Sequence, residues 1–235
     1  MPVLSRILIT GLVAGSIAGL AITVLQLATL VPLLHQAELY EASFGANETL
    51  SMHDNILQDQ NQAGVFGKSL LTLLSNGMTG IGFGLVIAAG MSLLGRTRAW
   101  HGLLWGVGGF LAWSLLPAIG VPPALPGMEQ APLLERQSWF LVTALFSSAG
   151  LLILVLLRPL WLKPLGLILL AMPHIYGAPV APAAQSGIPL ELSEQFLMAS
   201  LSTSAAFWLL LGIIASSVFR TLVRNPQADM VCEAS

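Results

Sequence analysis

Long apolar stretches without charged side chains dominate this sequence and restrict the folds open to it. The first of them runs from Ile7 to Leu34 without a single Lys, Arg, Asp or Glu. A helix rises about 1.5 Å per residue, so roughly 20 apolar residues cross the hydrocarbon core of a bilayer. Inside that core, backbone polar groups must be satisfied internally, which only helices and closed barrels achieve. These stretches therefore predict membrane-spanning helices.

Six such stretches predict an all-α, polytopic integral membrane protein with one membrane domain over residues 1–235. Composition agrees, because only 9% of the residues are charged, against roughly 25% in soluble domains. The first stretch exceeds the apolar core of a signal peptide, about 7 to 15 residues, so we expect it to be retained. Residues 35–68 are polar and predict an outer loop or a short amphipathic helix. The predicted spans are about 7–34, 69–95, 99–119, 138–157, 164–180 and 195–219.

The distribution of charge between the predicted spans indicates their orientation. Short cytoplasmic loops of membrane proteins collect Lys and Arg. When both termini are placed in the cytoplasm, the inner segments hold seven of the nine basic residues and the outer loops hold nine of the eleven acidic ones. The only basic residues outside are then Lys68 and Arg136. We therefore expect cytoplasmic termini and a negatively charged outer mouth.

Several classes of function are excluded by what the sequence lacks. A net charge of −2 provides no basic surface for nucleic acid, so nucleic acid is not an expected partner. The single cysteine, Cys232, can form no intramolecular disulfide. The chain has no GxxxxGK[ST] phosphate loop, no HExxH zinc motif and no GxSxG nucleophile turn. We predict neither an enzyme nor a tightly bound cofactor.

A histidine beside a proline interrupts the fifth apolar stretch, in the segment MPHIYGAP (residues 172–179). Pro173 has no N–H and leaves the carbonyl of Leu169 without its usual helical partner. Free backbone groups at membrane depth are tolerated only where they face protein or a water-filled cavity. We therefore expect His174 to point inward and to bind a metal ion. The alternative, that His174 only forms a hydrogen bond to another helix and stiffens a kink, stays open.

A second group of candidate ligands follows the first apolar stretch, in PLLHQAELYEA. His35, Glu38 and Glu41 stand three residues apart, so they are surface neighbours if the helix continues. Imidazole and carboxylate together suit borderline divalent ions such as Co²⁺, Ni²⁺ and Zn²⁺. The three residues are therefore candidate metal ligands at the outer mouth. A solvated, helix-capping role for His35 and Glu38 is the alternative.

Glycines at four-residue spacing mark two helix faces that can approach another backbone closely. Such small-xxx-small faces are typical of helix contacts in membranes. The spacing fits packing within this chain and also fits a seam between two copies, so an oligomer is not excluded. The residues are Gly11, Gly15 and Gly19 in the first stretch and Gly80 and Gly84 in the second.

Five segments in order, LLHQAELYE, HGLLWGVGGF, GVPPALPG, RQSWF and MPHIYGAP, resemble the CbtA family of predicted cobalt transporter subunits. The resemblance extends from the first span to the last. It implies a multi-pass protein of the bacterial inner membrane, linked to cobalt supply for cobalamin synthesis. It also implies a small one-span partner called CbtB. In GVPPALPG the family pattern favours an acid where this chain has Ala124, so any ligand role of that acid is absent here.

Two functions remain open from the sequence. In the first, the chain is a subunit that carries a divalent cation, with Co²⁺ as the transported ion, and His35, Glu38, Glu41 and His174 supply ligands along the route. In the second, it is a non-transporting structural or assembly subunit of a membrane complex. Measured metal uptake by the reconstituted chain separates the two.

Overall fold

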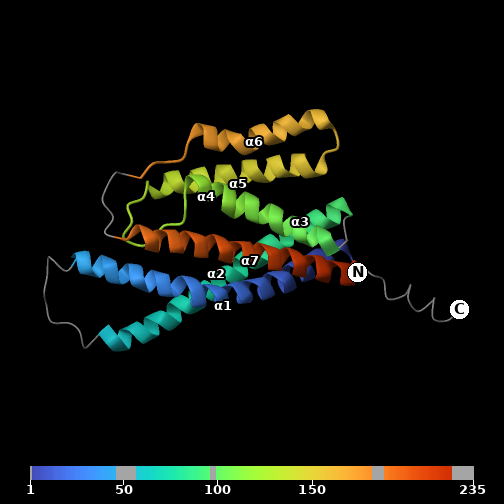
Figure 1. The fold of residues 1–235 in the computed structure, drawn as a ribbon. Helices are drawn as coiled ribbons and strands as arrows, with labels where there is room; N and C mark the ends of the chain where they lie inside the picture. Colours follow the sequence, from blue (N-terminus) through green and yellow to red (C-terminus); the bar gives the residue numbers. More distant parts are fainter. Residues whose placement is uncertain (1, 46–56, 96–98, 182–187, 224–235) are drawn as a thin grey trace, which may run out of the picture. The chain divides into compact units, whose positions relative to one another are not determined.

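The computed structural model describes residues 2–45, 57–95, 99–181 and 188–223, and every regular element in them is helical. Figure 1 shows the elements in chain order. The first two helices are the longest and reach well beyond a membrane span. The elements are α1 (Val3–Gly45), α2 (Leu57–Leu94), α3 (Ala99–Phe110), the π-helical turn η1 (Leu111–Leu115), α4 (Leu116–Gly120), α5 (Leu133–Leu156), the 3₁₀ turn η2 (Leu160–Leu162), α6 (Lys163–Tyr176) and α7 (Leu190–Val223).

The helices confirm an all-α, polytopic membrane protein. Among the described residues, five helical segments are long and apolar enough to cross a membrane: Val3–Tyr40, Ser69–Leu94, Trp100–Gly120, Leu133–Leu156 and Leu190–Val223. The fifth predicted span, 164–180, is different, because the apolar helix there covers Leu160–Tyr176 and is shorter. Its α-helical part has 14 residues, about 21 Å at helical rise.

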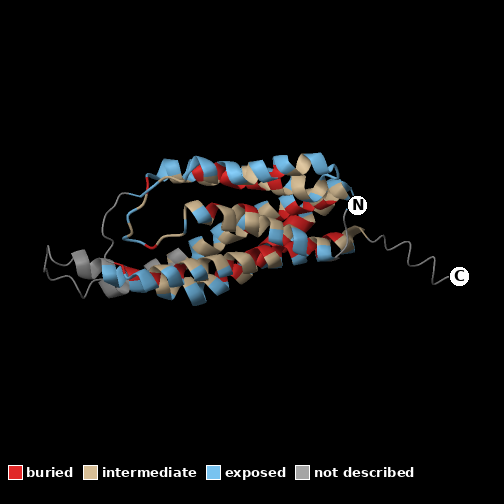
Figure 2. Ribbon diagram, turned by 45° about the horizontal axis from the view of Figure 1, so that its top comes forward, coloured by how far each residue is buried: buried red, intermediate tan, exposed pale blue. Residues whose placement is uncertain are grey.

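Large apolar side chains cover the outer faces of the helices. In Figure 2 much of each described helix is drawn as exposed, and Leu93 and Ile175 leave 87% and 83% of their surface uncovered. Soluble monomers rarely expose contiguous apolar surface on this scale. The surrounding lipid therefore supplies the apolar environment that water would not.

Residues 35–68 contain more helix than a loop would. The helix α1 continues to Gly45 and α2 begins at Leu57, so the polar segment extends both helices instead of joining them directly. His35 and Glu38 accordingly lie on helix, as their spacing requires. The side chain of Glu41 is outside the described residues.

The chain divides into two compact units, and α1, α2, α3 and α7 contribute residues to both. Unit 1 contains residues 1–24, 66–107 and 206–235. In unit 1 the glycine faces of α1 and α2 pack on each other. A Cβ added at Gly15 would overlap the backbone of Gly80 and Ile81, and one at Gly84 would lie 2.9 Å from the carbonyl oxygen of Gly11. The glycine spacing thus serves packing within the chain.

Unit 2 contains residues 25–65 and 108–205, and α5 and α6 pack closely on each other within it. They run side by side in Figure 1, and a Cβ at Gly150 would lie 2.7 Å from the carbonyl oxygen of Gly166. At the connection between them, Lys163 Nζ donates to the carbonyl oxygens of Leu154 and Leu157, the latter at 2.7 Å. The lysine therefore satisfies carbonyl groups that the end of α5 leaves free.

The proline-rich segment between α4 and α5 is anchored at Leu125, which is fully buried. Leu125 belongs to an apolar cluster with side chains from α1 and α7. The segment is thereby fixed within unit 2 although it has no regular structure of its own. The other buried members of this cluster are Ala37, Ile188, Leu192 and Phe196.

Candidate functional site

His174 lies in the last turn of α6. The helix ends at Tyr176 because Gly177 takes a φ of 97°, a left-handed value that favours glycine, while its N–H still donates to the carbonyl oxygen of Pro173 at 3.1 Å. Pro173 is buried. Pro173 therefore sits in the final turn of α6. The sequence had suggested a kink in a helix that continues, and the helix ends here instead. The missing N–H still leaves Leu169 without its helical donor.

The imidazole of His174 packs edge-on against the indole of Trp139 on α5. Their ring centroids are 5.8 Å apart and the ring planes are inclined by 74°. The Nε2 atom of His174 and the Nε1 atom of Trp139 are both buried, and neither has a hydrogen-bond partner among the described residues. A buried polar atom without a partner costs roughly 1 to 3 kcal/mol. Two such atoms at one contact suit a bound water molecule or ion that would satisfy them.

Two hydroxyl groups on α5 extend this row of unpartnered polar atoms. Thr143 and Ser147 are 0% exposed, and neither Oγ1 nor Oγ has a partner among the described residues. In a helix, residues four apart lie on the same face. This face carries Trp139 at one end and Gly150 at the other, and both contact α6. We call Trp139, Thr143, Ser147 and His174 the α5–α6 polar seam.

Several other buried or partly buried hydroxyls of the chain are satisfied locally, although Thr10 Oγ1 in unit 1 is also buried without a partner among the described residues. Thr23 donates to the carbonyl oxygen of Gly19 at 2.8 Å, and Thr203 donates to that of Ala199 at 2.6 Å. Ser148, next to Ser147, donates to Ala144 in the same way. Back-bonding of this kind is the usual solution for Ser and Thr inside helices. The hydroxyls of the seam are therefore available to something else.

The seam offers neutral nitrogen and oxygen ligands. An imidazole nitrogen, two hydroxyl oxygens and the carbonyl oxygen freed by Pro173 are electron-pair donors that suit a borderline divalent ion. None of them carries a negative charge. A site of this kind holds a cation weakly, which suits passage more than storage, because conduction requires that an ion can leave again.

The exposed pair at the other candidate site is close enough to interact. His35 Nδ1 lies 3.3 Å from Glu38 Oε2, and the two side chains are 58% and 48% exposed. Within the described ranges, no group of three or more His, Cys, Asp or Glu side chains could hold a metal ion. His174 therefore does not join His35 and Glu38 in one cluster.

Two further histidines occur in the chain. His53, with Asp54, lies outside the described residues. The imidazole of His101 contacts the indole of the neighbouring Trp100 in a tilted arrangement, with ring centroids 4.3 Å apart, which agrees with an anchoring role at the membrane interface.

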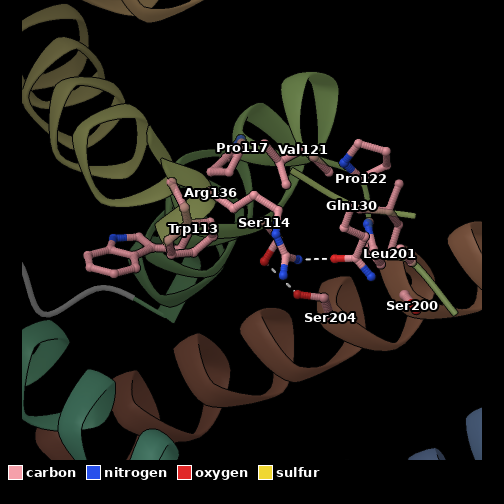
Figure 3. Close-up of a pocket in the computed structure, with 14 residues that line it drawn as sticks. Trp113, Ser114, Pro117, Val121, Pro122, Gln130, Arg136, Ser200, Leu201 and Ser204 are labelled. Carbon is pink, nitrogen blue, oxygen red and sulfur yellow. Dashed lines mark hydrogen bonds between the residues drawn. The ribbon is translucent and has the colours of Figure 1, made fainter. Parts of the chain in front are cut away.

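Unit 2 also contains a cavity that the sequence did not reveal. It has a volume of about 580 Å³ and lies between η1, α4, the proline-rich segment, α5 and α7. Figure 3 shows Arg136 and Gln130 on one side of it, with Ser114 and Ser204 nearby. The hydroxyl oxygens of Ser114 and Ser204 are 2.6 Å apart. The usable signals in the sequence were an arginine at the start of an apolar helix and the proline-rich segment before it.

A π-helical turn helps to form this cavity. In η1 the N–H of Leu116 donates to the carbonyl oxygen of Leu111, so the helix carries one extra residue per turn there. Trp113 and Ser114 within the turn line the cavity. Such turns occur often at functional sites.

Comparison with known proteins gives one result. The family model described as "Probable cobalt transporter subunit (CbtA)" matches residues 4–220, nearly the whole chain. No curated protein and no solved structure matches the sequence.

Proposed function

Because this chain belongs to the CbtA family, we propose that it is the membrane-spanning subunit of a cobalt uptake system in the bacterial inner membrane. The imported cobalt would supply cobalamin synthesis. A small one-span subunit resembling CbtB is the expected partner. Cobalt is here the cargo of the protein and not a resident cofactor.

The observation that carries this proposal beyond the family is the unpartnered Nε2 atom of His174. It is buried in the α5–α6 polar seam, whose α5 face also carries the two unpartnered hydroxyl oxygens of Thr143 and Ser147. If the imidazole only joined two helices, it would be expected to use this nitrogen in a hydrogen bond. A cation in transit would satisfy the nitrogen and both hydroxyls while it passes. We therefore assign to His174 the role of a transient ligand.

The exposed pair His35 and Glu38 would act earlier on the route. If the termini are cytoplasmic, the acidic residues lie on the outer side and raise the local concentration of divalent cations. Glu41, one helical turn further along α1, would add to this attraction of cations. Since the side chains of His35 and Glu38 are 58% and 48% exposed, these two residues would attract the ion without enclosing it.

The membrane potential would provide the driving force. It contributes about 2.3 kcal/mol per charge for each 100 mV, or about twice that for a divalent ion.

To test the proposal, the purified chain is reconstituted into vesicles with an inward-negative potential, and accumulated cobalt is measured. We expect accumulation that an ionophore abolishes when it collapses the potential. Undiminished accumulation in depolarised vesicles would rule this coupling out.

The second candidate is a structural or assembly subunit that does not itself transport. It is favoured by the lack, in the described part of the chain, of any group of three or more strong metal ligands. In that case reconstituted vesicles accumulate no cobalt with the chain alone, whatever the potential. Cobalt uptake by cells would still require the chain.

A further inference from the structure

The cavity in unit 2 is lined by a positively charged side chain, whereas a site for a bare metal cation needs neutral or negatively charged ligands. Of the 14 residues that line it, Arg136 is the only one with a charged side chain. No carboxylate lines it, and Arg136 forms no ion pair with any residue that the structure describes. A guanidinium group stays protonated in proteins. Among the lining residues the only charge is therefore positive, which disfavours a bare divalent cation in this cavity.

Two hydrogen bonds hold the guanidinium of Arg136 in position. Its Nε donates to the carbonyl oxygen of Ala131 at 2.9 Å, and its Nη1 donates to Oε1 of Gln130. Both acceptors are neutral and both lie in the segment before α5. An arginine has five N–H donors, so these two bonds leave further donors for a ligand. In Figure 3 the group points toward Ser114 and Ser204.

The remaining walls suit a small polar molecule. Hydroxyls of Ser200 and Ser204 and the amide of Gln130 provide neutral hydrogen-bonding groups, and Trp113 and Phe140 provide apolar surface. A volume of about 580 Å³ falls in the range of small-molecule sites, roughly 300 to 1,000 Å³. An arginine that is held by two hydrogen bonds and keeps further N–H donors available recognises carboxylate and phosphate oxygens in particular.

We infer that this cavity binds the carboxylate or phosphate group of a small anion, with Arg136 as the charged anchor. The ligand is either a soluble anion or the headgroup of an anionic lipid, since both present the same oxygens. The inference does not depend on the role of His174, so failure of one leaves the other intact.

The experiment measures thermal unfolding of the full-length chain in detergent. Citrate, inorganic phosphate and short-chain phosphatidylglycerol are titrated separately, with phosphatidylcholine as the uncharged reference. A ligand that binds the folded state raises the unfolding midpoint in proportion to its affinity. A rise with citrate or phosphate identifies a soluble anion. A rise with phosphatidylglycerol alone identifies a lipid headgroup.

Variants distinguish this site from other positive charges. Arg136→Gln should weaken binding of the stabilising anion by about 10- to 100-fold, whereas Arg136→Lys should retain part of it. Ala124→Glu leaves Arg136 in place but introduces a carboxylate into the cavity lining, and it should likewise weaken binding. Arg158→Gln, at an exposed arginine outside the cavity, is the matched control and should bind as the wild type does.

Two results would overturn the inference. One is a wild-type chain that none of the three anions stabilises more than phosphatidylcholine does. The other is an equal response in the wild type, Arg136→Gln and Ala124→Glu. Because Ala124→Glu retains the guanidinium and its two bonds to the segment before α5, the test does not depend on the folding of one variant.

Discussion

The indole of Trp139 stands edge-on to the imidazole of His174, with ring centroids 5.8 Å apart, and the buried Nε1 and Nε2 atoms of these rings both lack a hydrogen-bond partner among the described residues. One atom is a donor only, and the other can bind a proton or a metal. The contact therefore places the indole ring of Trp139 beside an imidazole nitrogen of His174 that is available to bind an ion.

Replacement of His174 tests whether this nitrogen binds the transported ion. His174→Ala and His174→Gln should both abolish cobalt uptake at any salt concentration, because neither side chain supplies an imidazole nitrogen. Uptake is measured in vesicles at matched protein content, with His101→Gln as a control outside the seam. Wild-type rate and apparent affinity in either His174 variant would make His174 a packing residue.

Replacement of Glu38 should have a different signature. An exposed acid attracts cations over a distance that salt screens at about 8 Å under physiological conditions. Glu38→Gln should therefore slow cobalt uptake most at low ionic strength and little at high ionic strength. The measurement is the initial rate of uptake across a series of salt concentrations. An equal loss at every salt concentration would assign Glu38 a direct ligand role instead.

Trp139→Phe distinguishes the contribution of the aromatic ring from that of the indole N–H group. Phenylalanine keeps an edge-on ring beside His174 but removes a buried donor without a partner, whose cost is roughly 1 to 3 kcal/mol. We expect the lost packing to offset that gain, so that the free energy of unfolding changes by less than about 1.5 kcal/mol. If the indole N–H orients water molecules around the ion in the α5–α6 polar seam, cobalt uptake should fall as well. Thermal unfolding and uptake of the same preparation check both parts, and a strongly destabilised variant would contradict the first.

Gly15→Leu should destabilise unit 1, because any Cβ at this position overlaps the backbone of α2. Backbone cannot move aside as a flexible side chain can, so we expect a loss of at least about 1 to 3 kcal/mol, typical of overpacking. Gly82→Ala is the matched control, since a Cβ there meets no atom within 4 Å. Thermal unfolding in detergent compares the two. Equal stability would show that the α1–α2 contact is loose.

Cys232 tests the orientation of the chain. It is the only thiol and lies outside the described residues. If the C-terminus is cytoplasmic, a membrane-impermeant maleimide should label Cys232 in inverted vesicles and not in intact spheroplasts. Labelling of intact spheroplasts would contradict the predicted map of six spans with a cytoplasmic C-terminus.

The sequence was informative where one chemical preference dominates. Long apolar runs predicted the helices because burial of backbone polar groups in lipid leaves few alternatives. The i, i+3 spacing likewise predicted the contact between His35 and Glu38. Helix ends were less accurate, since polar residues after Leu34 continue α1 as far as Gly45 and hydropathy does not register a helix that leaves the membrane.

The polar seam and the cavity depend on pairings between distant segments. His174 was a candidate from the sequence, but its partner Trp139 became visible only when α5 and α6 were placed side by side. Arg136 looked like one of two basic residues on the acidic side. Its neighbours Ser114 and Ser204 are 90 positions apart, and the π-helical turn that presents Ser114 has no clear sequence signature.

The connection between α5 and α6 has a consequence for biosynthesis. With 14 residues, α6 is about 21 Å long, less than the roughly 30 Å of a hydrocarbon core, and it carries a histidine. A translocon that releases segments into lipid by their hydrophobicity would release α6 poorly on its own. We expect α5 and α6 to enter the bilayer together as a hairpin, tied at its base by Lys163. Substitutions in residues 157–163 would then lower the amount of correctly inserted protein and leave the transport rate per molecule unchanged.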